Sequence, residues 1–230
     1  MSGAPPAQPQ QRKVLLVVAA PAEAQAVLGA LGAHPQLTPW RPAAASSGID
    51  VVLSGVGKAN AAGAASAALV SGRYDAVLSV GIAGAYGDLP IGTAVAGSAA
   101  VYADEGVLDP DKFTDLAALG FPPADLPGMQ FPADPALFNL LRPLADAAGV
   151  IATVSTCSGT DALAAALAAR TGAIAECMEG AAVLHAARRL GVPAAELRII
   201  SNTTGDRPRQ VWNMGLALSK LADVIGRLRV

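Results

Sequence analysis

The chain has 230 residues, of which 53% are hydrophobic and only 15% charged, and its formal net charge is −2. This length suits one α/β domain with a sizeable core. Its lysines and arginines are not clustered, which excludes nucleic-acid binding driven by phosphate neutralisation and favours a small-molecule partner. With two cysteines and two distant histidines, the sequence predicts no disulfide framework, no metal cluster and a reducing, cytoplasmic location.

The N-terminal stretch MSGAPPAQPQQRK is rich in proline and glutamine and has no apolar signal core. We therefore expect residues 1–12 to form a disordered tail and residues 13–230 to form one folded domain. The longest apolar stretch is interrupted by Pro90, Gly92 and Gly97, which argues against a membrane span. The high apolar content instead predicts a buried sheet and a homo-oligomer, most simply a two-fold dimer.

The first half of the chain alternates short apolar runs with alanine-rich segments. In order, the pattern predicts a strand at 13–20, a helix at 21–32, a strand at 49–57, a helix at 58–72, and strands at 74–86 and 92–103. Continuous Val- and Leu-rich runs are typical of strands buried on both faces. The alternation predicts an α/β fold, a single domain with a mainly parallel twisted sheet flanked by helices on both faces.

The second half begins with a segment at 104–132 that is rich in Asp, Pro and Gly, which we expect to be a long loop around one short helix. The pattern then predicts a helix at 134–148, a strand at 149–159, a helix at 161–172 capped by Thr160, a strand at 173–177, a helix at 178–191 and a strand at 196–206. The last helix should bury one apolar face, made of Val211, Met214, Leu218, Leu221, Ile225 and Leu228.

Four polar clusters follow predicted strands: Glu23, SGVGKAN at 54–60, ECMEG at 176–180 and SNTTGD at 201–206. Ligands of open α/β sheets bind beyond the carboxyl ends of the strands, so we expect one composite site. SGVGKAN itself fails the phosphate-loop pattern, because Val52 and Ala59 occupy two required positions. It is more typical of a tight turn that leads into a helix.

Each polar residue also has a purely structural interpretation. Glu23 and Glu179 both fall in the first turn of a predicted helix, where the macrodipole favours a carboxylate. Met178 suits a core position, and Asn202 suits a turn. No single residue therefore identifies the function.

Five segments together resemble the nucleoside phosphorylase and nucleosidase superfamily. They occur in register as KVLLVVAAPAE, SGVGKANAA, YDAVLSVGIAGAY, AIAECMEGAAV and LRIISN. Within that superfamily the chain is most similar to the futalosine hydrolases, enzymes of an alternative menaquinone route. The alternatives are the methylthioadenosine/S-adenosylhomocysteine nucleosidases and the phosphorylases. The resemblance implies a partly barrel-like sheet, a homo-oligomer, a nucleoside substrate, and neither metal nor organic cofactor.

The resemblance also implies roles for individual residues. Glu23 matches the glutamate that deprotonates the attacking water, Met178 the methionine under the ribose, and Glu179 the glutamate that binds ribose hydroxyls. Further substrate contacts are implied for Ile82, Ala83 and Gly84 in one turn, and for Ser201 and Asn202 at the purine. Glu176 has no implied role, and either contacts the base or braces a loop.

The chain departs from the adenine-releasing nucleosidases at several positions. Asn202 replaces an aspartate, Cys177 a glutamate and Ile82 a serine, and STCSGTD offers no aromatic residue to stack on adenine. An asparagine amide can donate to O6 or N7 of a 6-oxopurine but cannot deliver a proton. We therefore expect a 6-oxopurine leaving group, with Asp206 as a candidate for the missing acid.

Water is the expected nucleophile. Phosphorylases of the superfamily place arginines near the sugar, and neither AAPAEA nor VLSVGIAGAY contains one. In the expected hydrolysis Glu23 acts as general base, while the Glu179 carboxylate stabilises the positive charge that grows on the ribose.

Overall fold

The computed structural model describes residues 12–71, 73–110 and 112–230. Its first half alternates strands and helices as predicted: β1 (Val14–Val18), α1 (Pro21–Ala30), β2 (Ala43–Ser46), β3 (Ile49–Leu53), α2 (Lys58–Leu69), β4 (Ala76–Ala85) and β5 (Ala94–Tyr102). β2 was not predicted, because its sequence AAAS lacks the apolar run of a buried strand.

The second half contains more short elements than expected. They are β6 (Gly106–Leu108), β7 (Phe113–Asp115), β8 (Gln130–Pro132), α3 (Pro135–Leu141), a 3₁₀ turn (Arg142–Leu144), β9 (Ala147–Thr153), α4 (Asp161–Thr171), β10 (Ala173–Cys177), α5 (Gly180–Arg189), β11 (Ala194–Thr203), a second 3₁₀ turn (Arg207–Arg209) and α6 (Met214–Arg227). Two predictions are confirmed in detail, since β10 spans the predicted residues and the Thr160 side chain caps α4.

The main sheet has nine strands in the order β10-β9-β5-β11-β4-β1-β3-β2, with β8 paired to β5. β10 pairs with β9 on one side and with β4 on the other. The five strands β10, β9, β5, β11 and β4 therefore close on themselves, and β1, β3 and β2 extend the sheet beyond this barrel. The sheet is mixed, because β11–β5 and β10–β4 are antiparallel whereas β1–β3, β1–β4 and β11–β4 are parallel. This confirms a partly barrel-like sheet flanked by helices.

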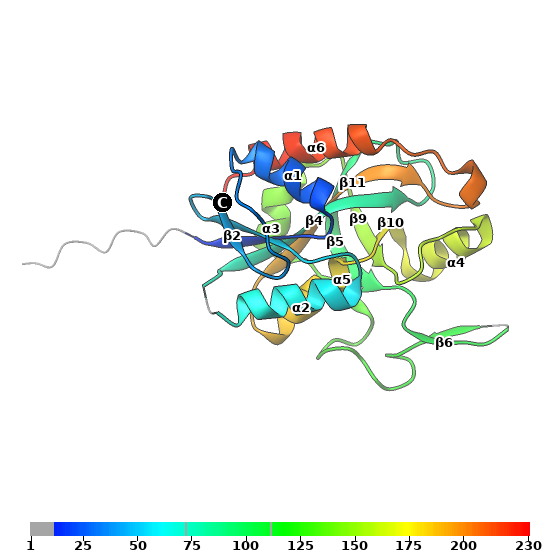
Figure 1. Ribbon diagram of the computed structural model, residues 1–230. Helices are drawn as coiled ribbons and strands as arrows, with labels where there is room; N and C mark the ends of the chain where they lie inside the picture. The colour runs from blue at the N-terminus through cyan, green and yellow to red at the C-terminus, as the bar shows by residue number, and fades with distance from the viewer. Residues whose placement is uncertain (1–11, 72, 111) are drawn as a thin grey trace, which may run out of the picture.

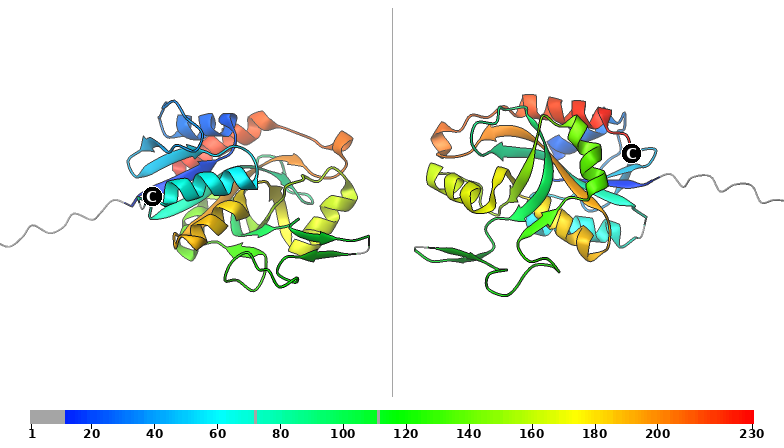
Figure 2. Two further views of the ribbon diagram at one scale, coloured as in Figure 1. Left: turned by 60° about the horizontal axis from the view of Figure 1, so that its bottom comes forward. Right: turned by 180° about the vertical axis from the view of Figure 1, so that it is seen from behind.

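Helices cover both faces of the sheet (Figure 1). α1 and α6 lie side by side on one face, and α2 and α5 lie together on the opposite face. The views from below and behind show that α3 lies on the same side of the sheet as α6 (Figure 2). The long connection after β5 carries the β6–β7 hairpin, which projects from the body of the molecule (Figure 1).

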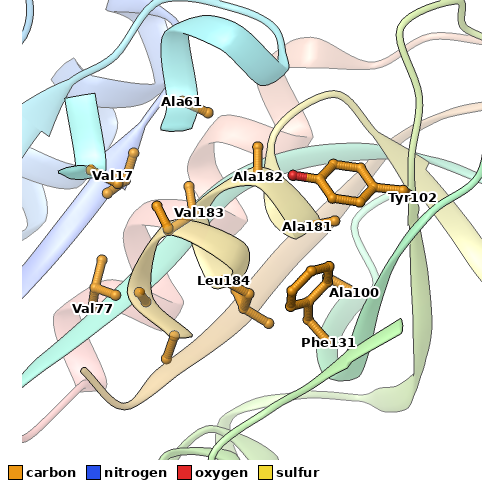
Figure 3. Close-up of a cluster of buried hydrophobic side chains, with 14 of the residues drawn as sticks. Val17, Ala61, Val77, Ala100, Tyr102, Phe131, Ala181, Ala182, Val183 and Leu184 are labelled. Carbon is orange, nitrogen blue, oxygen red and sulfur yellow. The ribbon is translucent and has the colours of Figure 1, made fainter. Parts of the chain in front are cut away.

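The hydrophobic core has three parts. One lies between the sheet and α2 and α5, where Val17 and Val77 face Ala61 and Val183 (Figure 3). A second lies under α1, α3 and α6. The third fills the barrel with side chains from its five strands: Ala83, Ala85, Val95, Ile151, Ala175, Cys177 and Ile200. Small residues make up most of this interior.

Two sequence predictions are wrong, and a third is correct only in part. Between residues 104 and 132 the described residues form no helix but the β6–β7 hairpin and the edge strand β8. The predicted helix at 134–148 ends at Leu141, because Pro143 breaks it, and β9 already begins at Ala147. The predicted apolar face of the last helix is confirmed at Leu221, Ile225 and Leu228, but Met214 is exposed and Val211 precedes α6 and is also exposed. Ala217 and Val224 complete the buried face.

None of the helices in the described part of the chain has both the length and the hydrophobicity needed to cross a bilayer. Most of the predicted N-terminal tail, residues 1–11, lies outside the described residues. The division into a tail and a single domain therefore stays a prediction.

Candidate active site

Glu23 is held at the first turn of α1 by two backbone bonds. Its Oε2 accepts from the Ala20 N–H at 2.8 Å, and its Oε1 accepts from the Ile82 N–H on β4, also at 2.8 Å. The side chain is only 4% exposed, and burial raises its pKa above the ordinary value of 4.5. The sequence offered a helix-start role or a catalytic role for Glu23, and the structure shows that the same carboxylate caps α1 and reaches the middle of the sheet.

Glu179 lies directly before α5, in the ECMEG segment. Its Oε1 accepts from the Gly57 N–H at 3.0 Å, and its Oε2 lies 3.4 Å from Nη1 of Arg198. The SGVGKAN turn therefore uses its backbone N–H to hold a glutamate instead of a phosphate, which agrees with the failed phosphate-loop pattern. Met178 stands next to Glu179 and is partly exposed.

Arg198 on β11 links the two glutamates. A side chain on Gly81 would place its Cβ 2.5 Å from Glu23 Oε1 and 2.7 Å from Arg198 Nη1, so both groups converge over the bare Cα of Gly81. The same Nη1 meets Glu179. Glu23, Arg198 and Glu179 therefore form one buried charged group, which we call the carboxylate–arginine cluster. Gly81 must be glycine because this close approach leaves no room for a methyl group.

A fourth charged residue, Glu196, fixes the arginine. Its Oε1 accepts from Arg198 Nε at 2.8 Å and from Cys177 Sγ at 3.1 Å, while Ser79 Oγ accepts from Arg198 Nη2 at 2.8 Å. Glu196 is fully buried, and its Oε2 has no hydrogen-bond partner among the described residues. A Cβ on Gly180 would lie 2.1 Å from Glu196 Oε1. The glycine of ECMEG, at the start of α5, therefore leaves space for a carboxylate that reaches it from β11.

The second half of the site surrounds Gly84, three residues further along β4. Gly84 pairs with Asn202 on β11 and with Glu176 on β10, so three strands meet at this level. The register of β11 shifts between Ile200 and Asn202, which leaves Ser201 as an extra residue in a bulge. The Ser201 hydroxyl donates to Asn202 Oδ1 at 2.7 Å, and Asn202 Nδ2 donates to Thr203 O at 2.9 Å.

Glu176 braces the wall of this region. Its carboxylate accepts from the Tyr86 hydroxyl at 2.7 Å, from the Ser158 N–H at 2.8 Å and from the Ser158 hydroxyl at 2.6 Å. These bonds tie β10 to the loop that precedes α4. Of the two roles considered for Glu176, the structure shows the bracing one.

A cavity of about 400 Å³ opens at this second half, and its wall includes Gly84, Ser158, Glu176, Asn202, Arg207 and Trp212. The volume suits a small organic ligand such as a purine base. Glu23, Met178 and Glu179 are not part of this wall. Across residues 12–71, 73–110 and 112–230, no cluster of three or more His, Cys, Asp or Glu side chains is arranged to hold a metal ion.

The cavity and the carboxylate–arginine cluster are neighbours. Gly81 and Gly84 are three residues apart on β4, which corresponds to about 10 Å along a strand. Ile82 and Ala83 span this interval. Cys157 lies in the cavity wall, and burial raises the pKa of its thiol. The negative charges of Glu176 and Glu179 raise this pKa further, which places both glutamates near Cys157. The spacing of the two regions along β4 is therefore comparable to the length of a nucleoside.

Asp206 lies away from this arrangement. Its carboxylate accepts from the Asp161 N–H at 3.0 Å and from Arg209 Nη2 at 2.7 Å, and these two contacts lower its pKa. A proton donor to the base needs the opposite shift and a place in the cavity wall. The structure therefore argues against the acid role considered for Asp206.

The prediction that all polar clusters share one carboxyl edge is correct only in part. Glu23 and Gly57 do follow the parallel strands β1 and β3, and Asn202 lies near the carboxyl end of β11. β10, however, runs antiparallel to β4, and ECMEG reaches the site because the barrel closes there. The chain therefore passes Gly84 at Glu176 and then runs back toward Arg198 at Glu179.

The comparisons with known proteins agree with this architecture. The family model of the Phosphorylase superfamily matches residues 13–228. Two curated relatives are both futalosine hydrolases: one from Acidothermus cellulolyticus is 39% identical over 94% of this chain and 90% of its own, and one from Streptomyces coelicolor is 40% identical over 79% and 78%. This chain belongs to the phosphorylase superfamily, in the futalosine hydrolase family.

The fold of this superfamily member is shared with solved structures of lower identity. A 5′-methylthioadenosine/S-adenosylhomocysteine nucleosidase from Neisseria meningitidis, in complex with methylthio-immucillin-A, superposes with a TM-score of 0.77 at 20% identity. The match covers 94% of this chain and 98% of that one. At this identity the likeness shows the fold, and the site has to be argued from this chain's own residues.

Sequence reasoning missed Arg198 and Glu196 in this superfamily member. Both stand two residues apart in the otherwise apolar run AAELRII, so their side chains point to the same face of β11. Charged residues are almost never fully buried unless they are paired. Two opposite charges two residues apart in an apolar strand were therefore a signal in the sequence for a buried ion pair.

Proposed function

We propose that this protein hydrolyses the N-glycosidic bond of futalosine and releases hypoxanthine. The observation that carries the proposal is the convergence of Glu23, Arg198 and Glu179 over Gly81, within about 10 Å along β4 of a purine-sized cavity. The substrate follows from the family, since both curated relatives described above are futalosine hydrolases. The reaction would belong to the menaquinone route that the resemblance implies.

Glu23 is the proposed general base. The carboxylate removes one proton from a water molecule as the water oxygen attacks C1′ of the ribose. The bond from C1′ to the purine nitrogen breaks, and its electron pair leaves with the base, which then takes up a proton. Burial raises the pKa of Glu23, and a base whose pKa lies closer to the working pH transfers protons more effectively.

Glu179 and Met178 are proposed to hold the ribose. The Glu179 carboxylate stays anchored by Gly57 and Arg198, so it is already oriented when positive charge develops on the sugar. Preorganised charges of this kind stabilise the transition state more than the ground state. The thioether of Met178 supplies apolar contact to one face of the ring.

Asn202 and its neighbours are proposed to contact the purine. With one Nδ2 hydrogen committed to Thr203 O, the other remains for N7 or O6 of the base. Backbone contacts to the substrate are also proposed for residues that lie between or beside the two halves of the site. These are Ile82, Ala83 and Gly84 on β4 and Ser201 on β11.

Hydrolysis is preferred to phosphorolysis because Arg198 is already occupied. Its Nε, Nη1 and Nη2 face Glu196, Glu179 and Ser79 respectively. A phosphate would need these donors and would meet three carboxylates around them. This arrangement favours an uncharged nucleophile.

The test is incubation of the purified protein with futalosine in phosphate-free buffer, with free hypoxanthine followed by chromatography. We expect release of hypoxanthine without any requirement for phosphate. A strict phosphate requirement would make the protein a phosphorylase. Release of adenine from methylthioadenosine, without activity on futalosine, would make it a nucleosidase of the kind with which it shares its fold.

We also propose that the protein is a cytoplasmic homo-oligomer with a single catalytic domain at residues 13–230. Both cysteines are free, which suits a reducing compartment. The region after β5 exposes large apolar side chains at Val107, Leu108 and Phe121, the last two more than 70% exposed. Such side chains gather at subunit contacts. Sedimentation of the purified protein tests this, since a monomer at micromolar concentration would contradict it.

A further inference from the structure

One glutamine organises the loop that follows β11. Gln210 Nε2 donates to Ser158 O at 2.8 Å and to Gly205 O at 2.9 Å, and its Oε1 accepts from Arg207 Nη1 at 2.8 Å and from Trp212 Nε1 at 3.3 Å. All hydrogen-bonding positions of this amide are therefore used. The bonds hold Arg207 and Trp212 in fixed places beside the loop that carries Ser158.

Arg207 and Trp212 form a cation–π pair in the cavity wall. The Arg207 guanidinium carbon lies 5.0 Å from the centre of the Trp212 ring, and both residues line the same cavity as Asn202. Trp212 is also joined to Asn202 by an antiparallel bridge between their backbones. The cavity therefore has a flat aromatic surface and a cation next to the residue that is proposed to contact the purine.

Among the described residues, no carboxylate forms an ion pair with Arg207. Within the described residues, the bond to Gln210 is the one polar contact of its side chain. The neighbouring Arg209 differs, because it pairs with both Asp161 and Asp206. The cavity wall also contains the carboxylate of Glu176, but three donors from Tyr86 and Ser158 already engage its oxygens.

These contacts match the chemistry of the leaving base. When the glycosidic bond breaks, its electron pair moves onto the purine, and in a 6-oxopurine the charge spreads to O6 and N7, which are both acceptors. A guanidinium presents several donors in one plane and suits two adjacent acceptors. An adenine edge instead offers a donor at N6, which would face the guanidinium donors. Asn202 cannot transfer a proton, so another residue has to stabilise this charge.

We propose that Arg207 binds the developing anion of the 6-oxopurine and that Trp212 is the surface on which the base stacks. The inference rests on the proposed function and deepens it, since it assigns the choice of the base to residues of the loop after β11. The pair also supplies the aromatic ring that the segment STCSGTD lacks.

The experiment compares Arg207→Met with wild type on futalosine and on its 6-amino counterpart. Removing one preorganised donor to a developing anion costs about 10²–10³-fold in kcat, and because Arg207 is exposed we expect about 10–100-fold on futalosine. We expect less than about threefold on the 6-amino substrate, and partial recovery in Arg207→Lys, which keeps the charge. Arg209→Met is the matched control, and its ratio of the two activities should equal that of wild type.

Binding provides a second measurement that does not depend on turnover. Calorimetric titration with free hypoxanthine and free adenine should show weaker binding of hypoxanthine alone in Arg207→Met. In Trp212→Leu both bases should bind about tenfold more weakly, because every base has a face that stacks. An equal loss for both bases in Arg207→Met, or no loss, would overturn the inference. Absence of futalosine hydrolysis by the wild type would instead refute the proposed function.

Discussion

The two halves of the candidate site are built in opposite ways. The carboxylate–arginine cluster is buried in the sheet, where Glu23, Glu179 and Arg198 are at most 6% exposed and bonded to backbone or to one another. The purine half ends in a loop whose Trp212 is 45% exposed and whose Arg207 has no ion pair among the described residues. The carboxylate–arginine cluster is therefore built on strands and helix starts, whereas Arg207 and Trp212 lie on a loop, where sequence can change at little structural cost.

The largest expected effect comes from removing the base in the buried half. Glu23→Gln should lower kcat on futalosine by about 10²–10⁴-fold, because general base catalysis contributes this much. Steady-state kinetics with purified protein measures the loss. Asp223→Asn on the exposed face of α6 serves as the control and should retain wild-type activity. A kcat within threefold of wild type for Glu23→Gln would move the base to another residue.

Arg198→Met tests whether the buried half contributes more to the stability of the protein than the exposed loop does. The change leaves Glu179 and Glu196 buried without their cation, and breaking a buried ion pair in this way costs about 3–5 kcal/mol. Arg209→Met removes an arginine of similar connectivity from the exposed loop and should cost far less. The free energy of unfolding in urea measures both. Equal losses of unfolding free energy in the two variants would contradict the difference between a buried and an exposed half.

The pH dependence of kcat/KM reports on the buried half. Glu23 must be ionised to accept a proton, and burial raises its pKa above 4.5. The rate should therefore fall as pH decreases through this raised pKa, by about tenfold per pH unit at the lower end. Measurement between pH 4.5 and 8 should place the acidic limb above the ordinary range of glutamate. In Glu23→Gln the limb due to this group should disappear, and its persistence would assign it to a different group.

Gly180→Ala tests whether Glu196 needs the space left by the glycine of ECMEG. The new Cβ would meet the Glu196 carboxylate at 2.1 Å, and overpacking of this kind costs about 1–3 kcal/mol. Thermal unfolding measures the loss, and kcat should fall with it because Glu196 orients Arg198. Gly29→Ala in α1, where a Cβ meets nothing within 4 Å, should leave stability equal or slightly higher. Equal behaviour of the two variants would contradict this packing.

The smallest expected effect is on substrate choice. Asn202→Asp should shift the ratio of kcat/KM toward the 6-amino substrate by about 3–10-fold, because a protonated aspartate can donate to N7 and accept from N6. Competition between futalosine and its 6-amino counterpart measures the ratio directly. Ser201→Ala, which removes the hydroxyl contacts to Asn202 Oδ1 and to Ala83 O, should change both activities by similar factors. An unchanged ratio in Asn202→Asp would show that Asn202 does not contact that edge.

The hydrophobic pattern of the sequence predicted helices and strands correctly where a segment had one dominant period or a clear residue signal at its end. β10 at 173–177 was predicted to the residue, and Gly172 ends α4 in the left-handed conformation that glycine tolerates. The pattern failed between residues 104 and 132, since strands of three residues carry too little periodicity to distinguish them from turns. It also overextended the helix before β9, where Pro143 was the signal that should have ended it.

The sequence by itself determined the alternation of buried strands and helices and the family, and it singled out Glu23, Met178, Glu179 and Asn202 as candidate site residues. The tertiary structure decided how they work together. Arg198 and Glu196 acquire their roles only when β11 lies beside β4 and β10, and Arg207 and Trp212 only when the loop after β11 closes over Ser158. The physical reason is that hydrophobic period and turn chemistry are local, whereas the pairing of buried charges depends on which strands become neighbours.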